Sequence, residues 1–268
     1  MQAQYTVVRL TDRDVIRAFL NRDRVRTAYA IGDLDDTLWP DSEFVGATDA
    51  TGELVAVLLL YHGLDPVVLT AFGPPDAVRA IVLAHDMPRE IYYLWLPELG
   101  KLLAEAYDVP NQHREWRMVL EPDAFQAPVL DGVAPIEPEQ ADVLAALFQH
   151  AAEPGEEVVA FSPAQIAQGA FFGVWVDGRL VATAGTHVWS VQERVTAIGN
   201  VFTRPDYRGR GYGTLCTAAV VAAALRAGMD TIILNVKQDN APAIRVYEKL
   251  GFRTHCVFLE GPGLRRAE

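Results

Sequence analysis

The stretch Arg208-Gly209-Arg210-Gly211-Tyr212-Gly213 lies between two runs that predict regular structure. The run before it, Val195–Thr203, is typical of a β-strand, and the alanine-rich run after it, Thr214–Leu225, is typical of a helix. Glycines adopt positive φ and let successive N–H groups point into one concavity. A helix start adds N–H groups without intrahelical acceptors and the positive end of its dipole. With Arg208 and Arg210 beside it, this arrangement predicts a diphosphate site.

Two common phosphate-binding loops do not fit this stretch. A Walker A loop ends in Gly-Lys followed by Ser or Thr, and no Lys follows Gly213. A Rossmann fingerprint requires its third glycine where Thr214 stands, and an acidic residue at the end of a following strand, which the sequence lacks. The spacing that does fit is Arg/Gln-x-x-Gly-x-Gly/Ala, at Arg208, Gly211 and Gly213.

This spacing resembles the pyrophosphate loop of the GNAT superfamily of acyl-CoA-dependent N-acyltransferases. Upstream, residues 201–207 are similar to the family's strand exit, and downstream, residues 235–252 are similar to its second CoA-contacting segment. The resemblance implies that acetyl-CoA is the co-substrate and that no metal takes part. The residues that it places on the cofactor are Val201, Phe202, Thr203, Arg208, Gly209, Arg210, Gly211, Tyr212, Gly213, Thr214 and Asn240.

The resemblance also implies a direct transfer chemistry. In the family, the strand corresponding to Val195–Thr203 splays from the next strand, here Thr231–Val236, and the acyl group enters between them. Tyr247 matches the tyrosine that protonates the departing thiolate, with a buried structural tyrosine as the alternative. Many members carry a glutamate base on the first of these strands, where this chain has Gly199 and Asn200. The base therefore stays open between Glu193 at the start of that strand, His187 on the preceding strand and a base that acts through water. Glu156 and Glu157 could instead hold a cationic amine, with a solvated loop as the favoured interpretation.

Two kinds of function fit this pattern. The first is an N-acetyltransferase that moves an acetyl group from acetyl-CoA directly to a primary amine of a small molecule, an amino acid or a peptide. The second is a non-catalytic acyl-CoA-binding sensor or interaction protein that keeps the fold. The loop together with Asn240 and Tyr247 favours the enzyme, whereas the missing strand carboxylate keeps the sensor open.

Composition, net charge and the length of apolar runs argue against several other classes of protein. The chain has 268 residues, of which 50% are hydrophobic, so it can bury a large core. Its net charge of −12 argues against a nucleic-acid partner, which requires basic surface. The longest apolar run is shorter than the roughly 18–20 residues that span a bilayer. Residues 1–5 do not resemble a signal peptide, so we expect a cytoplasmic protein without a membrane partner, and a homodimer stays open.

Cysteines and an acidic cluster offer further candidate chemistry. Cys216 and Cys256 have neither disulfide nor metal spacing, so we expect small core residues, with an acyl-cysteine intermediate as the lesser alternative. The segment Asp33-Leu34-Asp35-Asp36 could hold a metal or an amine, but a solvated turn or cap is the favoured interpretation.

Thr11 is expected to cap a helix that runs to Leu20.

The order of predicted elements repeats along the chain. From Leu54 and again from Leu180, the pattern predicts strand, strand, helix, strand, helix and strand, and the last strand of the second copy is Thr254–Leu259. The first copy has residues 71–75, Ala-Phe-Gly-Pro-Pro, in place of the long glycine loop. We therefore expect an α/β fold with mixed sheets and two tandem GNAT-like domains, resembling the glycine N-acyltransferase arrangement. Residues 1–126 would be the degenerate domain without a CoA loop, and residues 127–268 the catalytic domain that binds acyl-CoA.

Overall fold

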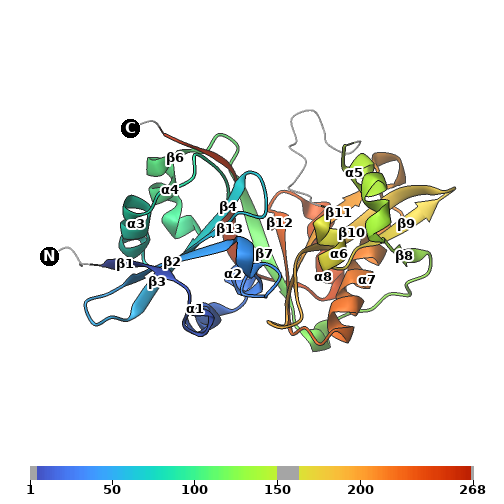
Figure 1. Cartoon of the computed structure of the whole chain (residues 1–268). Helices are drawn as coiled ribbons and strands as arrows, with labels where there is room; N and C mark the ends of the chain where they lie inside the picture. Colours follow the sequence, from blue (N-terminus) through green and yellow to red (C-terminus); the bar gives the residue numbers. More distant parts are fainter. Residues whose placement is uncertain (1–4, 150–162, 267–268) are drawn as a thin grey trace. The chain divides into compact units, whose positions relative to one another are not determined.

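A computed structural model describes residues 5–149 and 163–266 of the chain (Figure 1). The chain forms two compact units, one made of Met1–Trp116 with Cys256–Glu268 and the other of Arg117–His255. The mixed α/β fold expected from the sequence is confirmed. The last strand leaves the second unit at Cys256 and pairs in the sheet of the first. The domains expected at residues 1–126 and 127–268 stay a prediction.

The sheet of the first unit has the strand order β1-β2-β3-β4-β5-β13, with the short β6 also pairing with β13. Its neighbours are antiparallel except for β4 and β5, which are parallel. Strand β2 had no counterpart in the sequence prediction. The strands are β1 (Thr6–Leu10), β2 (Ser42–Thr48), β3 (Leu54–Tyr61), β4 (Val67–Phe72), β5 (Glu90–Trp95), β6 (Tyr107–Asp108) and β13 (Arg253–Arg265).

Two helix starts of the first unit can be compared with their sequence signals. Pro75 is the first residue of α3, as expected for a proline whose missing N–H costs nothing there. The predicted cap at Thr11 is wrong, because Oδ1 of Asp12 accepts from the N–H groups of Asp14 (2.9 Å) and Val15 (3.3 Å). Figure 1 shows α3 beside α4, and α1 beside α2. The helices are α1 (Arg13–Leu20), α2 (Ala28–Gly32), α3 (Pro75–Ala84) and α4 (Gly100–Ala106).

The acidic segment that follows α2 divides into two kinds of residue. Asp35 accepts from the N–H (3.0 Å) and the hydroxyl (2.8 Å) of Thr37, and Asp36 pairs with Arg13, which fits the turn interpretation. Asp33 differs, because burial raises the pKa of its carboxyl to about 8. Among the described residues, no group of three or more His, Cys, Asp or Glu side chains is arranged to hold a metal ion.

The second unit holds the glycine loop. Its sheet runs β12-β11-β10-β9-β8, and β11 and β12 are its parallel pair. Strand β7 begins in the first unit and continues into the second. The strands are β7 (His113–Leu120), β8 (Val133–Pro135), β9 (Phe172–Val176), β10 (Arg179–Ser190), β11 (Val195–Thr203) and β12 (Thr231–Lys237). The helices are α5 (Ala141–Gln149), α6 (Ala164–Gln168), α7 (Tyr212–Arg226) and α8 (Ala241–Leu250).

Two sets of apolar side chains cover this sheet. A cluster of Ile136, Leu144, Leu147, Phe148, Ile166, Phe171 and Leu180 joins α5 and α6 to the strands. Helix α7 packs on β9, β10 and β11 through small residues, which let a helix approach a sheet closely. Cys216 on α7 is completely buried, as the core interpretation predicted, whereas Cys256 is only partly buried. None of the described helices is long and apolar enough to span a membrane.

Candidate active site

A bulge interrupts the pairing of β10 with β11 near the middle of β11. Thr183 pairs with Phe202, but the next pair joins Gly185 to Gly199, so β11 has one residue more than β10 in this interval. Within it, Asn200 has a φ of 52°, in the left-handed region that non-glycine residues rarely adopt. A bulge of this kind bends its strand and changes the direction of nearby side chains. The sequence placed Asn200 in this region but did not predict the bulge.

Strands β11 and β12 part immediately before the bulge. Their parallel register runs from Val195↔Thr231 to Ile198↔Leu234 and ends there, although β11 continues to Thr203 and β12 to Lys237. This is the splay that the family resemblance implied. The edge of β11 after Ile198 can therefore offer its backbone N–H and C=O groups to an extended ligand, as an unpaired strand edge does.

The glycine loop connects the end of β11 to α7. Gly209 and Gly211 have φ angles of 77° and 82°, and a Cβ built on either would meet no atom within 4 Å. Helix α7 begins at Tyr212, so its first intrahelical bond runs from the N–H of Leu215 to the carbonyl of Gly211 (3.1 Å). The N–H groups of residues 212–214 precede that bond and lie at the positive end of the helix dipole. The loop thus has the open space and the N–H donors that an anion requires.

The two arginines of the loop are exposed and attached to its backbone. Nε of Arg208 donates to the carbonyl of Thr203 (3.2 Å), which ties the loop to the last residue of β11. Arg210 donates to the carbonyl of Asp206 (3.3 Å), and its guanidinium lies 5.0 Å from the ring centre of Tyr207. Both cationic groups therefore stay at the surface of the loop, where they can reach a bound anion.

Helix α8 has the bounds that the sequence predicted, Ala241–Leu250. Asn240 is its N-cap, and Oδ1 of Asn240 accepts from the N–H of Ala243 (3.2 Å). Tyr247 is 6% exposed, and its ring meets that of Phe252 edge to face, with 6.0 Å between centroids. The buried, packed ring agrees with the alternative that Tyr247 is a structural tyrosine. The catalytic role of its hydroxyl stays a prediction.

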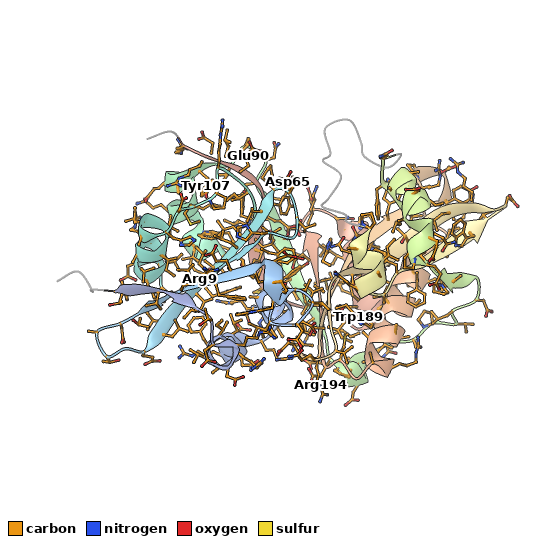
Figure 2. The ribbon with its side chains drawn as sticks, in the orientation of Figure 1. Arg9, Asp65, Glu90, Tyr107, Trp189 and Arg194 are labelled. Carbon is orange, nitrogen blue, oxygen red and sulfur yellow. The ribbon has the colours of Figure 1, made fainter. Side chains whose placement is uncertain are left out.

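Glu193, the described carboxylate candidate for the base, lies away from the splay. Glu193 is buried in the hairpin that joins β10 to β11, the hairpin labelled by Trp189 and Arg194 in Figure 2. From Val195, where β11 begins, Gly199 lies four residues on, about 13 Å along an extended strand. Glu156 and Glu157 lie outside the described residues. His187, on β10, lies against Gly199.

The structure adds a buried pair that sequence reasoning missed. Arg117 on β7 is 1% exposed, and its Nε donates to Oδ1 of Asn235 (2.9 Å). Asn235 is the first residue of β12 after the last parallel pair, so this interaction lies where the strands part. The sequence signal was the single amide within Thr231–Lys237, an otherwise mostly apolar strand, but its partner is distant in the chain.

Residues 139–252 match the model of the Acetyltransferase (GNAT) family. This segment is similar to GNAT acetyltransferase domains. It contains the bulge, the splay, the glycine loop and α8, so the features described above all lie within the matched GNAT residues. The family resemblance seen in the sequence is confirmed at this level, while the finer likeness to glycine N-acyltransferases stays a prediction.

Several relatives of the chain are named mycothiol acetyltransferase. A mycothiol acetyltransferase of Corynebacterium aurimucosum is 39% identical over 83 residues, which are 28% of this chain and 27% of that protein. A mycothiol acetyltransferase of an Arthrobacter species is 27% identical over 250 residues, 89% of this chain and 72% of that protein. In four further relatives of this name the matched share of the relative is only 27–31%.

Solved structures show the same fold over the whole chain. A Drosophila protein superimposes with a TM-score of 0.72 at 13% identity, covering 97% of this chain and 98% of that one. A tandem GNAT protein from the clavulanic acid biosynthesis pathway superimposes with a TM-score of 0.58 at 14% identity, with 99% of each chain covered. These likenesses support the two GNAT-like domains predicted from the repeated element order.

Proposed function

We propose that the chain is an acetyltransferase that moves an acetyl group from acetyl-CoA directly to a primary amine of a small molecule, an amino acid or a peptide. The observation that carries this proposal is the parting of β11 and β12 after Ile198↔Leu234, next to a loop that opens a helix. A diphosphate site and an open strand edge in one GNAT domain are what a thioester of CoA requires. The shared name of the relatives supports acetyl as the transferred group.

We assign the cofactor to the second unit. The N–H groups of Tyr212, Gly213 and Thr214, with those of Gly209 and Gly211 beside them, would hold the diphosphate. Arg208 and Arg210 would add charge from the loop surface. The backbone of Val201–Thr203 would pair with the amides of the pantetheine arm, and Asn240 would contact CoA from the start of α8. The first unit has no such loop in its sequence, so we propose that it binds no cofactor.

Tyr247 is the proposed general acid. Its hydroxyl would give a proton to the departing sulfur, because the sulfur leaves more readily as a neutral thiol than as a thiolate anion. Pro242 lies in the first turn of α8 and Asn240 caps it, so the start of this helix is fixed by two local signals. A firmly placed helix holds the tyrosine in one position, which general-acid catalysis requires.

Direct transfer is favoured over an acyl-cysteine intermediate. Burial raises the pKa of the Cys216 thiol to about 12, and Cys216 is completely buried. A thiol in this environment stays protonated at neutral pH and is a poor nucleophile. We therefore propose that the amine attacks the thioester itself, without a covalent intermediate on Cys216.

The acceptors to test are small primary amines, amino acids and short peptides. With acetyl-CoA present, at least one of these amines is expected to cause release of free CoA thiol and to gain one acetyl group by mass. Thiol release and product mass are measured together, so that hydrolysis of acetyl-CoA is not counted as transfer. Binding of acetyl-CoA without turnover on any amine would contradict the proposal and favour the acyl-CoA sensor.

A further inference from the structure

His187 occupies a second irregular position in β10. Thr186 pairs with Ile198 and Val188 pairs with Ala197, so His187 is the extra residue between two consecutive residues of β11. An extra residue in one strand of an antiparallel pair forms a β-bulge, which aims its side chain away from the regular alternation. The direction of the His187 side chain is therefore set by this bulge.

The imidazole of His187 lies where residue 199 would carry a side chain. A Cβ built on Gly199 would overlap Nε2 and Cδ2 of the ring. Gly199 is not among the residues with positive φ, so its backbone does not require glycine. Glycine is required at position 199 because the His187 ring occupies the space that a Cβ would need. His187 and Gly199 are thus a matched pair, in which the neighbouring strand supplies the side chain that β11 lacks.

This pair lies at the point where the strands part. Gly199 directly follows Ile198, the last residue of β11 in register with β12. Gly199 and Asn235 each follow one member of the pair Ile198↔Leu234. Because side chains alternate along strands, both residues lie on the same face of the sheet. Asn235 holds the buried Arg117 guanidinium on that face.

The same face is covered by the segment next to α6. Gly185 pairs with Gly199 and so shares its face, and a Cβ on Gly185 would overlap the ring of Phe171. Phe171 belongs to the apolar cluster of α5 and α6. The imidazole, the amide of Asn235 and the guanidinium of Arg117 are therefore polar groups on the side of the splay that faces this cluster.

We propose that His187 is the general base of the acetyl transfer, in the place of the strand carboxylate that β11 does not have. As the C–N bond forms, the imidazole accepts the proton that the amine nitrogen loses. As the C–S bond breaks, its electron pair goes to the sulfur, which takes a proton from the Tyr247 hydroxyl. His187 then releases its proton to water and Tyr247 recovers one, so the reaction balances. This inference rests on the proposed function.

Glu193, the other described candidate, lies too far from the splay to act as the general base. Glu193 lies in the hairpin before β11, and Gly199 is four residues beyond the first residue of that strand, about 13 Å away. A base must come within hydrogen-bond reach of the proton it takes, directly or through one water. Of the two, His187 lies at the splay and Glu193 does not.

The test compares variants on the amine that the wild type acetylates fastest. His187→Ala and His187→Gln are expected to lower kcat/KM by about 100-fold, the weaker end of general-base effects, because water can replace the base in part. The dissociation constant of acetyl-CoA should change little, because the imidazole is not among the groups proposed to hold CoA, and a melting curve shows that each variant is folded. His255→Ala, which removes an exposed histidine of the same unit, is the matched control and should keep wild-type activity.

Two rescues separate a base from a packing residue. Added imidazole should restore part of the activity of His187→Ala, because the variant leaves a space beside Gly199. Placing a carboxylate on β11, as Gly199→Glu in the His187→Ala background, should recover at least tenfold of the loss. The single change Gly199→Ala should instead lower kcat, because its Cβ displaces the ring.

The outcomes distinguish this inference from the proposed function. A wild type that acetylates an amine while His187→Ala does so equally fast would overturn the role of His187 alone. A slow His187→Ala variant that neither rescue improves would also overturn it, and would make His187 a packing residue. A wild type that acetylates no amine would overturn the proposed function, and this inference would fall with it.

Discussion

Replacing Gly211 by glutamate is expected to abolish binding of acetyl-CoA while the chain remains folded. A side chain at this position would enter the open space that the loop keeps free, since a Cβ there meets no atom within 4 Å. Its carboxylate would compete with the diphosphate for the N–H groups at the start of α7 and would repel it. Like charges placed together cost several kcal/mol, so affinity should fall by more than about 100-fold.

Calorimetric titration measures the affinity of the variant, and its melting curve shows whether it is folded. The φ of 82° at Gly211 means that any side chain adds strain of about 1–2 kcal/mol, so a modest drop in melting temperature is expected. Gly132→Glu is a matched control, because Gly132 also has a positive φ (79°) and open space around its Cβ but lies outside the loop. A folded Gly211→Glu chain with unchanged affinity would show that the diphosphate binds elsewhere.

Replacing Tyr247 by phenylalanine is expected to lower kcat by about 10- to 1000-fold, within or just below the usual range of general-acid effects. The ring would keep its burial and its edge-to-face contact with Phe252, so packing should survive the change. The change removes only the hydroxyl, which is the proposed proton donor to the departing sulfur. Because a CoA thiolate is already a good leaving group, the reaction should slow without stopping.

The measurement for Tyr247→Phe is kcat under conditions where the chemical step limits the rate, together with the dissociation constant of acetyl-CoA. That constant should change little. Tyr107→Phe is a suitable control, because the Tyr107 hydroxyl donates to the carbonyl of Pro88 (2.8 Å) in the first unit and has no proposed part in transfer. Wild-type kcat in Tyr247→Phe would remove the acid assignment, and a large loss of affinity would make Tyr247 a binding or packing residue.

Local signals in the sequence were enough to predict much of the second unit. The glycine loop, the strand before it and the helix Ala241–Leu250 depend on residues that are neighbours in the chain, and their predicted bounds are close to those observed. Pro242 and Asn240 mark the start of α8 through contacts within one turn. The family resemblance added the splay of β11 from β12, which the register then showed.

Apart from the cap of α1, the features that the sequence did not predict depend on distant partners. Strand β13 was predicted as Thr254–Leu259 in the second domain, but it extends to Arg265 and pairs with β5, and no local pattern specifies which sheet edge a strand will choose. The contact of Arg117 with Asn235 joins residues far apart in the sequence. The position of His187 follows from a bulge, which is a property of two paired strands rather than of one.

The central claim is that the chain has a single acyl-CoA site, formed by the loop and the parted strands of its second unit. Titration of the whole chain with acetyl-CoA, followed by calorimetry, tests this claim most directly. The account predicts one site per chain, lost in Gly211→Glu. Two equivalent sites per chain, or no binding at all, would contradict it.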